Sequence, residues 1–324
     1  IIMGLGVNDP KGVFGTTDGL LEKYGSDRVF EMPISENAIT GVLVGAAING
    51  HRPIMSHQRV EFALLSLDQI INQASKMHYM SAGKLKIPIV IRIIIGQGWG
   101  NGAQHSQSLI SLFANIPGLK VVAPFSPYDA KGMMITSIYD NNPVIFFEHR
   151  WLHNNIGKFP KKIYKVPFGK AKVLKRGSDL TIISYSYSLI ECIKCYEFFK
   201  EHNLKIEIID LRSINPLDIK TILKSVRKTK KAIIVDNGWS RFGVASEVIA
   251  LINENILIKE NILFSRKGFF ESPAPSTRSL VKYYYPNAIN IGKKINKIFN
   301  LSINLKKLQS VTDDIPDDNF TGPF

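Results

Sequence analysis

The run "IPIVIRIII" (residues 87–95) is apolar at every position except Arg92. A strand with water on one face alternates apolar and polar residues, whereas a continuous apolar run is typical of a strand covered on both faces. Similar runs recur through the first half of the chain, at 52–56, 87–95, 120–125 and 143–149. Segments with helical spacing of apolar residues, 62–83 and 126–140, lie between them. The alternation predicts a parallel sheet with helices on both faces.

A second series follows a stretch rich in Lys, Gly and Pro at 154–179, which lacks a helical stripe and is interpreted as a connection between domains. Its strand-like runs are "LTIISYS" (180–186), "KIEIIDL" (205–211) and "KAIIVDNG" (231–238), each followed by a helical pattern. The predicted fold class is α/β, with two doubly wound domains. The predicted boundaries are 1–160 for the first domain, 161–176 for a linker, 177–303 for the second domain and 304–324 for an extended tail.

The totals are those of an ordinary globular protein: 324 residues, 45% hydrophobic and 21% charged. No apolar run reaches the roughly 18–20 residues that cross a bilayer, so we expect no membrane span. No signal peptide is visible, and we expect a cytoplasmic location, or the mitochondrial matrix if the source is eukaryotic. The opening "IIMGLGV" reads as the middle of a strand, which suggests that residues upstream are missing.

The net charge of +14 is concentrated in the second half. Residues 1–157 carry 12 Lys/Arg and 11 Asp/Glu, whereas residues 158–324 carry 29 and 16. One interpretation is an acidic partner that docks on the second half. The other is a Lys-rich composition on solvated faces, which the sequence alone favours. No recognisable module or aromatic-studded basic stripe indicates nucleic-acid binding.

Cys192 and Cys195 are the only two cysteines, so a disulfide framework is excluded and a reducing compartment is expected. Their C-x-x-C spacing raises the alternative of a redox pair. Redox pairs of this kind sit at a helix start, where the helix dipole lowers the thiol pKa. Here both sulfurs fall on the apolar side of a predicted helix at 187–202, so we expect core packing.

A glycine-rich segment, "GQGWGNGAQHSQS" (96–108), follows a predicted strand and precedes a predicted helix. Its glycine spacing matches neither a dinucleotide fingerprint nor a Walker loop. It presents polar residues, Gln104, His105, Ser106 and Gln107, near the carboxyl edge of a parallel sheet, where ligands of such sheets usually bind. His105 is as compatible with capping a helix as with acting on a substrate.

The stretch "PISENAITGVLVGAAING" (33–50) places one carboxylate at the head of an apolar helix. Ser35 is a suitable N-cap, and Glu36 in the first turn would interact favourably with the helix dipole. The alternative is that Glu36 is a buried acid with a chemical task. Gly41 and Gly45 lie one turn apart, and glycine costs about 1 kcal/mol against alanine inside a helix. The pair therefore predicts a close contact, such as a subunit or domain interface.

These segments together resemble a known family. The order "ISENAITGVLVGAAINGHRPI", "FALLSLDQIINQASKMHYMS", "IPIVIR", "AQHSQS", "PGLKVVAPFSPYDAKGMMITSIYDNNPVIFFEH" and "VPFGKAKVLKRGSDLTIISYS" is similar to the beta subunits of 2-oxoacid dehydrogenases, which act on pyruvate or branched-chain oxoacids. The resemblance covers nearly the whole chain, and these motifs are specific in combination. It implies a thiamine-diphosphate pyrimidine-binding domain followed by a transketolase C-terminal domain.

The resemblance gives roles to five residues. The family motif, a Glu followed by two spaced glycines, falls on Glu36, which would hydrogen-bond a ring nitrogen of the cofactor's aminopyrimidine and so help to form the ylide. Phe62 matches an aromatic that packs against that ring, and Ile34 matches a residue that lines the same pocket. Gln58 replaces a residue that usually packs near the cofactor. His105 matches a histidine of the active-site channel, which assists substrate binding or acyl transfer to lipoamide.

The segment "SIYDNNPV" (137–144) resembles a loop whose backbone carbonyls bind a structural potassium ion in some relatives. By position, the carbonyls would belong to Ile89, Ser137, Ile138, Asp140 and Asn142. A plain turn that ends a helix is an equally good interpretation.

Two differences from the family affect the function. "SHQRVEF" (56–62) replaces a more apolar run, so that Gln58 and Arg59 add polarity beside the pocket and the substrate can differ from pyruvate. The chain also lacks the G-D-G motif, with an Asn about thirty residues later, that holds diphosphate through magnesium in such enzymes. A diphosphate cannot be left unpaired inside a protein.

The resemblance therefore implies that an alpha subunit supplies the Mg2+ and diphosphate half of the site, in an α2β2 heterotetramer that serves a lipoyl-bearing acyltransferase core. Two alternatives remain: a split transketolase-like or synthase-like subunit acting on a sugar-related substrate, and a non-catalytic scaffold subunit.

Overall fold

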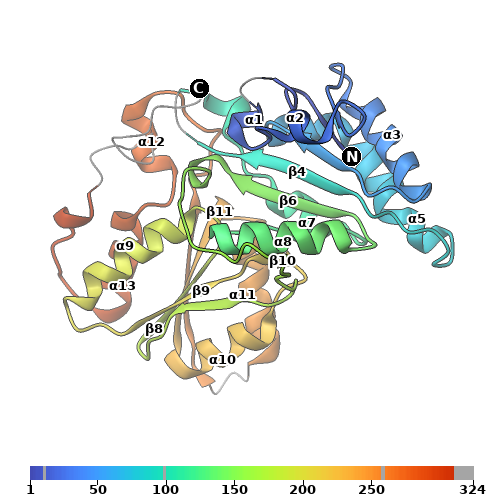
Figure 1. The fold of residues 1–324 in the computed structure, drawn as a ribbon. Coiled ribbons are helices and arrows are strands. Elements are labelled where there is room, and N and C mark those ends of the chain that lie inside the picture. The colour runs from blue at the N-terminus through green and yellow to red at the C-terminus, as the bar shows by residue number, and fades with distance from the viewer. Residues whose placement is uncertain (10–11, 98–99, 257–259, 310–324) are drawn as a thin grey trace.

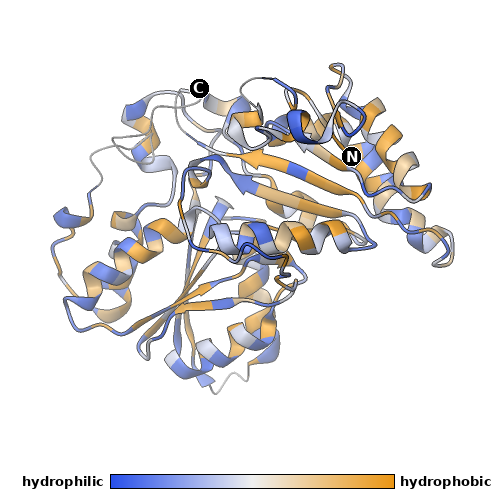
Figure 2. Ribbon diagram, viewed as in Figure 1, coloured by the Kyte–Doolittle hydropathy of each residue, from blue (hydrophilic) through white to orange (hydrophobic). Residues whose placement is uncertain are grey.

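The computed structural model describes residues 1–309 apart from 10–11, 98–99 and 257–259. Two α/β units, each built on its own sheet, pack against each other (Figure 1). Hydrophobic residues concentrate in the strands and on the helix faces that cover them (Figure 2). The main hydrophobic core includes residues of both units, for example Met55 and Phe147 of the first and Ile209 and Val248 of the second. The two-domain α/β architecture predicted from the sequence is confirmed.

Seven strands form the first sheet, in the order β10-β5-β6-β4-β3-β1-β2. Every neighbouring pair is parallel except β10 and β5, which are antiparallel. The strands are β1 Ile2–Gly4, β2 Val29–Phe30, β3 Ile54–His57, β4 Val90–Ile95, β5 Lys120–Val122, β6 Val144–His149 and β10 Ser213–Asn215. All six residues of β4 are buried, which confirms that the continuous apolar run is a central strand covered on both faces.

The helices of the first unit follow the parallel strands. They are α1 Gly12–Gly15, α2 Leu20–Tyr24, α3 Glu36–Ile48, α4 Val60–Ala63, η1 Leu64–Ser66, η2 Gln69–Ala74, α5 Ser75–Met80, α6 Gly102–His105, α7 Ile110–Ala114, α8 Pro127–Tyr139 and η3 Arg150–Leu152. The helix predicted over 126–140 is α8. The single helix predicted over 62–83 is instead a helical path that changes its hydrogen-bond register, from α to 3-10 to π and back to α.

Five strands form the second sheet, in the order β12-β11-β8-β9-β7. They are β7 Lys172–Lys175, β8 Leu180–Ser184, β9 Ile206–Asp210, β11 Lys231–Trp239 and β12 Leu263–Phe269. Its helices are α9 Ser188–Lys200, α10 Ile219–Thr229, α11 Val244–Asn255, α12 Arg278–Tyr284, α13 Ala288–Phe299 and the short η5 Lys306–Leu308. The segment interpreted as a linker, 161–176, contains β7, which pairs antiparallel with β9 and so belongs to this sheet.

Two contacts join the two units: one strand pairing and one ion pair. Strand β10 comes from the second half yet completes the first sheet by pairing with β5. Helix α8 lies between the two sheets in Figure 1, and Asp129 in its first turn pairs with Arg212 of the second half at 2.9 Å. Asp129 is fully buried, so this ion pair is held inside the contact. A strand and a buried charge pair therefore fix the relative position of the units.

The cysteines and the start of the predicted tail belong to the second core. Cys192 and Cys195 are fully buried on α9, and burial raises the pKa of both thiols. The Cys195 thiol donates to the Ala288 carbonyl at 3.0 Å. The core interpretation of the C-x-x-C pair is thus confirmed. Leu305 and Leu308, at the start of the predicted tail, also pack on this core, while residues 310–324 lie outside the described part.

Candidate functional site

The predicted site residues lie at one edge of the first sheet. Strands β1, β2, β3, β4 and β6 are mutually parallel through their pairing, so their carboxyl ends meet at the same edge. Residues 33–36 follow β2, residues 58–62 follow β3 and residues 96–107 follow β4. The site residues Ile34, Glu36, Gln58, Phe62 and His105 are all in these three segments.

Glu36 begins α3 and is buried, with 5% of its surface exposed. Ser35 occupies the N-cap position, but its side chain makes no capping hydrogen bond. The Glu36 carboxylate makes no hydrogen bond to any residue that the structure describes, although its backbone carbonyl accepts one from the Thr40 hydroxyl at 2.7 Å. A solvated helix-start acid would be exposed. The carboxylate oxygens are not among the atoms that lack both solvent and a partner, so the side chain is largely buried while its carboxylate can still be reached by a ligand.

Phe62, like Glu36, lies in the first turn of its helical segment. The Thr40 hydroxyl donates to the Ser66 hydroxyl at 2.9 Å, so α3 and η1 touch at this point. Glu36 and Phe62 each precede their partner in this contact by four residues, which is one helical turn. Both helical segments start at the carboxyl edge of the sheet. The contact therefore carries the acid and the aromatic ring to one end of the helix pair.

His105 completes this group from the glycine-rich loop. It ends α6, and its ring lies 5.8 Å from that of Phe62 in an edge-to-face arrangement. Its Nδ1 is buried and has no hydrogen-bond partner among the described residues. The structure thus brings together Phe62 and His105, which are 43 positions apart in the chain. An unpaired ring nitrogen in such a position is available to a substrate or cofactor.

The other two predicted pocket residues are placed differently. Ile34 is 81% exposed and contributes nothing to the core of this chain. Gln58 is half-buried, and its Nε2 donates to the Leu5 carbonyl at 2.9 Å, at the end of β1. Ile34 therefore presents an apolar surface outward, and Gln58 fastens the segment after β3 to the segment after β1.

Glu61 has a part in this site that was not predicted from the sequence. Arg59 Nη1 donates to the His105 carbonyl at 2.9 Å, and the Gln107 amide donates to Glu61 Oε1 at 2.9 Å. Burial raises the pKa of Glu61, although its amide hydrogen bond, Arg59 and His105 oppose that shift. Burial also lowers the pKa of Arg59. Only the polarity of "SHQRVEF" hinted at these contacts, because Glu61 is 46 positions from Gln107.

The second unit covers the other side of the loop. Gly102 has a φ of +60°, and a Cβ there would come within 2.4 Å of the Ser276 hydroxyl. Burial raises the pKa of Tyr285, and the neighbouring Ser106 side chain opposes that shift. Gly102 is therefore required both by its backbone conformation and by the close approach of the second unit. His105 is held between the two units.

The predicted potassium loop contains an arginine contact. Arg52 Nη1 donates to the carbonyls of Ile138 and Asp140, each at 2.8 Å, and Nη2 donates to the Asn141 side chain at 2.7 Å. The Ser137 carbonyl accepts from the Asp140 amide at 3.2 Å.

The fifth predicted carbonyl group, that of Ile89, accepts from the Val144 amide at 2.9 Å. No hydrogen bond to the Asn142 carbonyl occurs among the described residues. Each carbonyl that accepts one hydrogen bond keeps a second lone pair. The loop therefore binds the Arg52 guanidinium and still has carbonyl oxygens that could accept a further contact.

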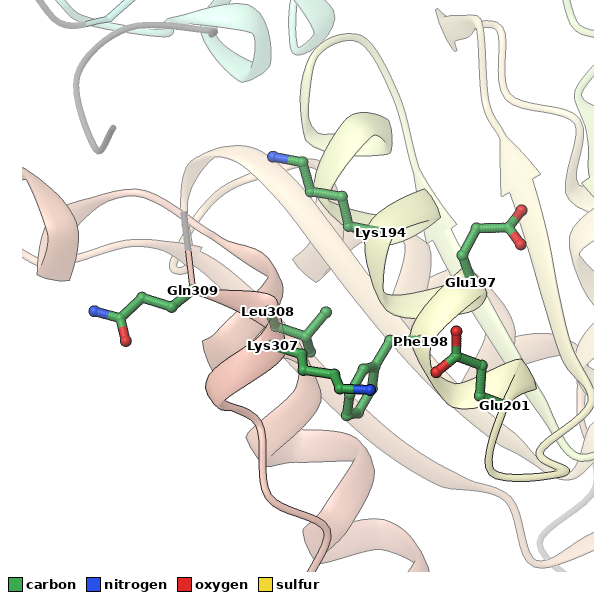
Figure 3. A pocket seen from close by; sticks show the side chains of 7 residues that line it. All are labelled: Lys194, Glu197, Phe198, Glu201, Lys307, Leu308 and Gln309. Atoms are coloured by element: carbon green, nitrogen blue, oxygen red, sulfur yellow. The ribbon is translucent and has the colours of Figure 1, made fainter. Parts of the chain in front are cut away.

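Two cavities among the described residues lie in the second unit, away from Glu36. One, of about 440 Å³, is lined by residues between 194 and 309, and Figure 3 shows Phe198 and Lys307 at its wall. The other, of about 480 Å³, is lined by residues between 171 and 228.

Within the described residues, no group of three or more His, Cys, Asp or Glu is arranged to hold a metal ion. No described helix has the length and hydropathy needed to cross a membrane.

The residues at the sheet edge fit the aminopyrimidine half of thiamine diphosphate. Glu36 offers a buried carboxyl group that lacks a partner, and Phe62 and His105 offer an aromatic face and an unpaired ring nitrogen beside it. These are groups that a protonatable aromatic ring requires: a proton-exchanging partner and a flat apolar contact.

Comparisons with known proteins agree with this geometry. The family model described as "Transketolase, pyrimidine binding domain" matches residues 2–154, and "Transketolase, C-terminal domain" matches residues 169–291. A solved structure, "Split gene transketolase, inactive beta4 tetramer", superposes with a TM-score of 0.75 at 19% identity and covers 93% of each chain, which shows a shared fold.

Curated relatives match over most of their length. The pyruvate dehydrogenase E1 component subunit beta of Rickettsia conorii is 37% identical over 302 residues, 93% of each chain. That of Bacillus subtilis is 39% identical over 259 residues, 80% of each chain. The beta subunit of the acetoin:2,6-dichlorophenolindophenol oxidoreductase of Cupriavidus necator is 38% identical, covering 92% of this chain and 89% of its own. The chain therefore belongs to the transketolase-type family that contains the beta subunits of the pyruvate dehydrogenase E1 component.

Proposed function

We propose that this chain is the beta subunit of a heteromeric thiamine-diphosphate-dependent 2-oxoacid dehydrogenase and that it contributes the aminopyrimidine half of the cofactor site. The observation that carries the proposal is the buried Glu36 carboxylate, which has no hydrogen bond to a described residue and lies at the same end of its helix pair as Phe62. The reaction would be decarboxylation of a 2-oxoacid such as pyruvate, with reductive acylation of lipoamide.

The roles of the residues follow from their chemistry. When bound, thiamine diphosphate supplies the electron sink for decarboxylation. Glu36 would exchange a proton with a ring nitrogen of the aminopyrimidine, because a carboxyl group in a dry site can both donate and accept. Phe62 would pack on the ring, with Ile34 and Gln58 at its margins. His105 would use its free Nδ1 to hold the substrate or to assist acyl transfer.

The half-site requires a second chain. We infer an alpha subunit that carries the G-D-G…N motif and binds Mg2+ and the diphosphate, because this sequence has no such motif. Helix α3 offers a surface for it: a Cβ at Gly45 would meet no atom within 4 Å, and Val42 is 59% exposed. An α2β2 heterotetramer and a lipoyl-bearing acyltransferase core complete the assembly, in the cytoplasm or, in a eukaryote, the mitochondrial matrix.

A potassium ion at the turn after α8 stays part of the proposal. The carbonyls of Ile89, Ser137, Ile138, Asp140 and Asn142 would be its ligands. Arg52 already donates to two of them, so the ion would share these oxygens with a guanidinium group. Sharing an acceptor with a cation weakens binding, and we expect modest affinity.

Acetoin cleavage is a second candidate, because the Cupriavidus necator relative matches as well as the pyruvate dehydrogenase subunits do. The distinguishing experiment is co-expression of the full chain with a candidate alpha subunit that carries G-D-G…N. We expect thiamine-diphosphate-dependent and Mg2+-dependent turnover of pyruvate or another 2-oxoacid by the pair and none by either chain alone. Turnover of acetoin alone would support the second candidate.

Other outcomes separate the remaining alternatives. Ketol transfer from a sugar phosphate would indicate the split transketolase-like or synthase-like subunit. An assembly that forms but turns over none of these substrates would indicate a scaffold. Activity of this chain without a partner would contradict the half-site.

A further inference from the structure

The Arg59 side chain forms hydrogen bonds at both ends of the short helix α6 Gly102–His105. Arg59 Nη1 donates to the carbonyl of His105, the last residue of α6, and Nη2 donates to the side chain of Asn101, its N-cap residue, at 3.1 Å. A helix end leaves carbonyls unpaired, and a nearby cation satisfies them favourably. One guanidinium group thus spans a one-turn helix that cannot be stable by itself.

A second contact holds the residue just beyond the helix. The Gln107 amide donates to Glu61 Oε1 at 2.9 Å. Arg59 and Glu61 therefore bond to the main chain at positions 105 and 107, on either side of Ser106. The Ser106 side chain lies near Tyr285 of the second unit, whose pKa it lowers against the effect of burial. Two side chains from another segment therefore hold the main chain on both sides of Ser106.

Arg59 and Glu61 have a rigid base. Arg59 is the N-cap of α4, and Glu61 lies in its first turn. Between and after them, Val60 and Ala63 are fully buried in the main core. Gln58 also ties the same segment to the Leu5 carbonyl. Because this base is packed, the two polar side chains can transmit its position to the loop.

The loop needs such support because of its composition. Gly96, Gly100 and Gly102 are among the described residues of the segment after β4, and the last two have positive φ. Glycine leaves the chain more freedom than any other residue, so a catalytic side chain on this loop loses precision unless contacts restore it. Arg59 and Glu61 are half-buried, so that less water competes for their hydrogen bonds than at the surface.

We propose that Arg59 and Glu61 are positioning residues that clamp the backbone around His105 and so set its ring against Phe62. The role rests on the proposed function, in which His105 meets the substrate. Neither residue needs to touch the substrate. The clamp acts on the main chain of residues 105 and 107. It should therefore affect turnover only when the His105 side chain is present.

A double-mutant cycle in the assembled enzyme tests this role. Arg59→Met should lower kcat by about 10- to 100-fold, as misplacement of a catalytic group does, with a smaller change in KM. Arg59→Lys keeps one charged donor and should recover part of the loss. In a His105→Ala background, Arg59→Met should change kcat by less than about twofold, because there is no side chain left to position. An equal loss in both backgrounds would overturn the proposal.

Hydrogen exchange on the full chain, without its partner, tests the clamp independently of activity. Glu61→Ala should accelerate exchange of the Gln107 amide, whereas Glu61→Gln, which keeps an acceptor oxygen, should preserve its protection. Glu254→Gln and Arg176→Met, at exposed positions of the second unit, serve as matched controls. Unchanged exchange at Gln107 in Glu61→Ala would refute the clamp. An assembly without 2-oxoacid turnover would refute the proposed function, and the exchange result would still decide whether the clamp exists.

Discussion

The Thr40 hydroxyl donates to the Ser66 hydroxyl across 2.9 Å, and both side chains are completely buried. The single hydroxyl hydrogen of Thr40 is shared with the Glu36 carbonyl, one turn earlier, at 2.7 Å. This small polar contact joins α3 to the helical path that begins at Val60 and includes Phe62. It sets the acid and the aromatic ring of the candidate site at the same end of two neighbouring helices, and it makes that arrangement testable.

Replacing Thr40 by Val should destabilise the protein. The change keeps the volume but leaves the Ser66 hydroxyl buried without its donor, and an unpaired buried hydroxyl costs about 1–3 kcal/mol. The Thr40→Val/Ser66→Ala pair removes both groups and should recover most of the free energy of unfolding. Urea denaturation with an unchanged m-value measures it. If Ser66→Ala lowers the free energy of unfolding of the Thr40→Val variant further, by as much as Thr40→Val did alone, the two hydroxyls do not act as a pair.

Glu36→Gln should separate catalysis from stability. Turnover by the assembled enzyme should fall by about 100-fold or more, since an amide cannot exchange the proton. The thermal midpoint of the chain should stay the same, because the Glu36 carboxylate makes no hydrogen bond to a described residue that the amide would lose. Glu254→Gln, at an exposed site, should change neither. Full activity in Glu36→Gln would exclude the proton-exchange role. A lower thermal midpoint would indicate instead that the Glu36 charge stabilises the start of α3.

Stability should decrease in mild acid because of a buried histidine. Burial lowers the pKa of His57 to about 4, below the value of about 6.5 expected in the unfolded chain. Between these values the unfolded chain binds a proton that the folded protein does not, so the free energy of unfolding falls as the pH drops from about 6.5 to about 4. His57→Leu should flatten this pH dependence, and His51→Leu, at an exposed position, should not. Equal slopes in wild type and His57→Leu would contradict the prediction.

Potassium should stabilise the chain if it binds at the turn after α8. With KCl in place of tetramethylammonium chloride at equal ionic strength, we expect the thermal midpoint to rise, by about 2–4 °C for each kcal/mol of binding free energy. Arg52→Gln should enlarge the difference, since it removes a cation that shares the Ile138 and Asp140 carbonyls. Identical midpoints in both salts for both proteins would remove potassium from the proposal and leave Arg52 as the cation that binds the Ile138 and Asp140 carbonyls.

Much of the architecture could be predicted because it depends on local pattern. Continuous apolar runs such as 87–95 give central strands, and β3, β4, β5 and β6 lie where these runs predicted them. Short or polar strands escaped this reasoning. β10, of three residues, is a strand only because β5 offers an open edge to it. β7 carries lysines at both ends and was hidden in a segment that reads as a linker.

The candidate site shows the same division. The sequence by itself determined the types of residue available and their order: an acid at the start of a helix, an aromatic after β3 and a histidine on a glycine loop. Only the tertiary structure decided that Glu36 is buried without a partner, that Phe62 lies 5.8 Å from His105 and that Arg59 and Glu61 hold the loop. Periodicity reports on neighbours within a few residues, whereas these contacts join positions about 40 or more residues apart, and packing of parallel strands at a common edge is what brings them together.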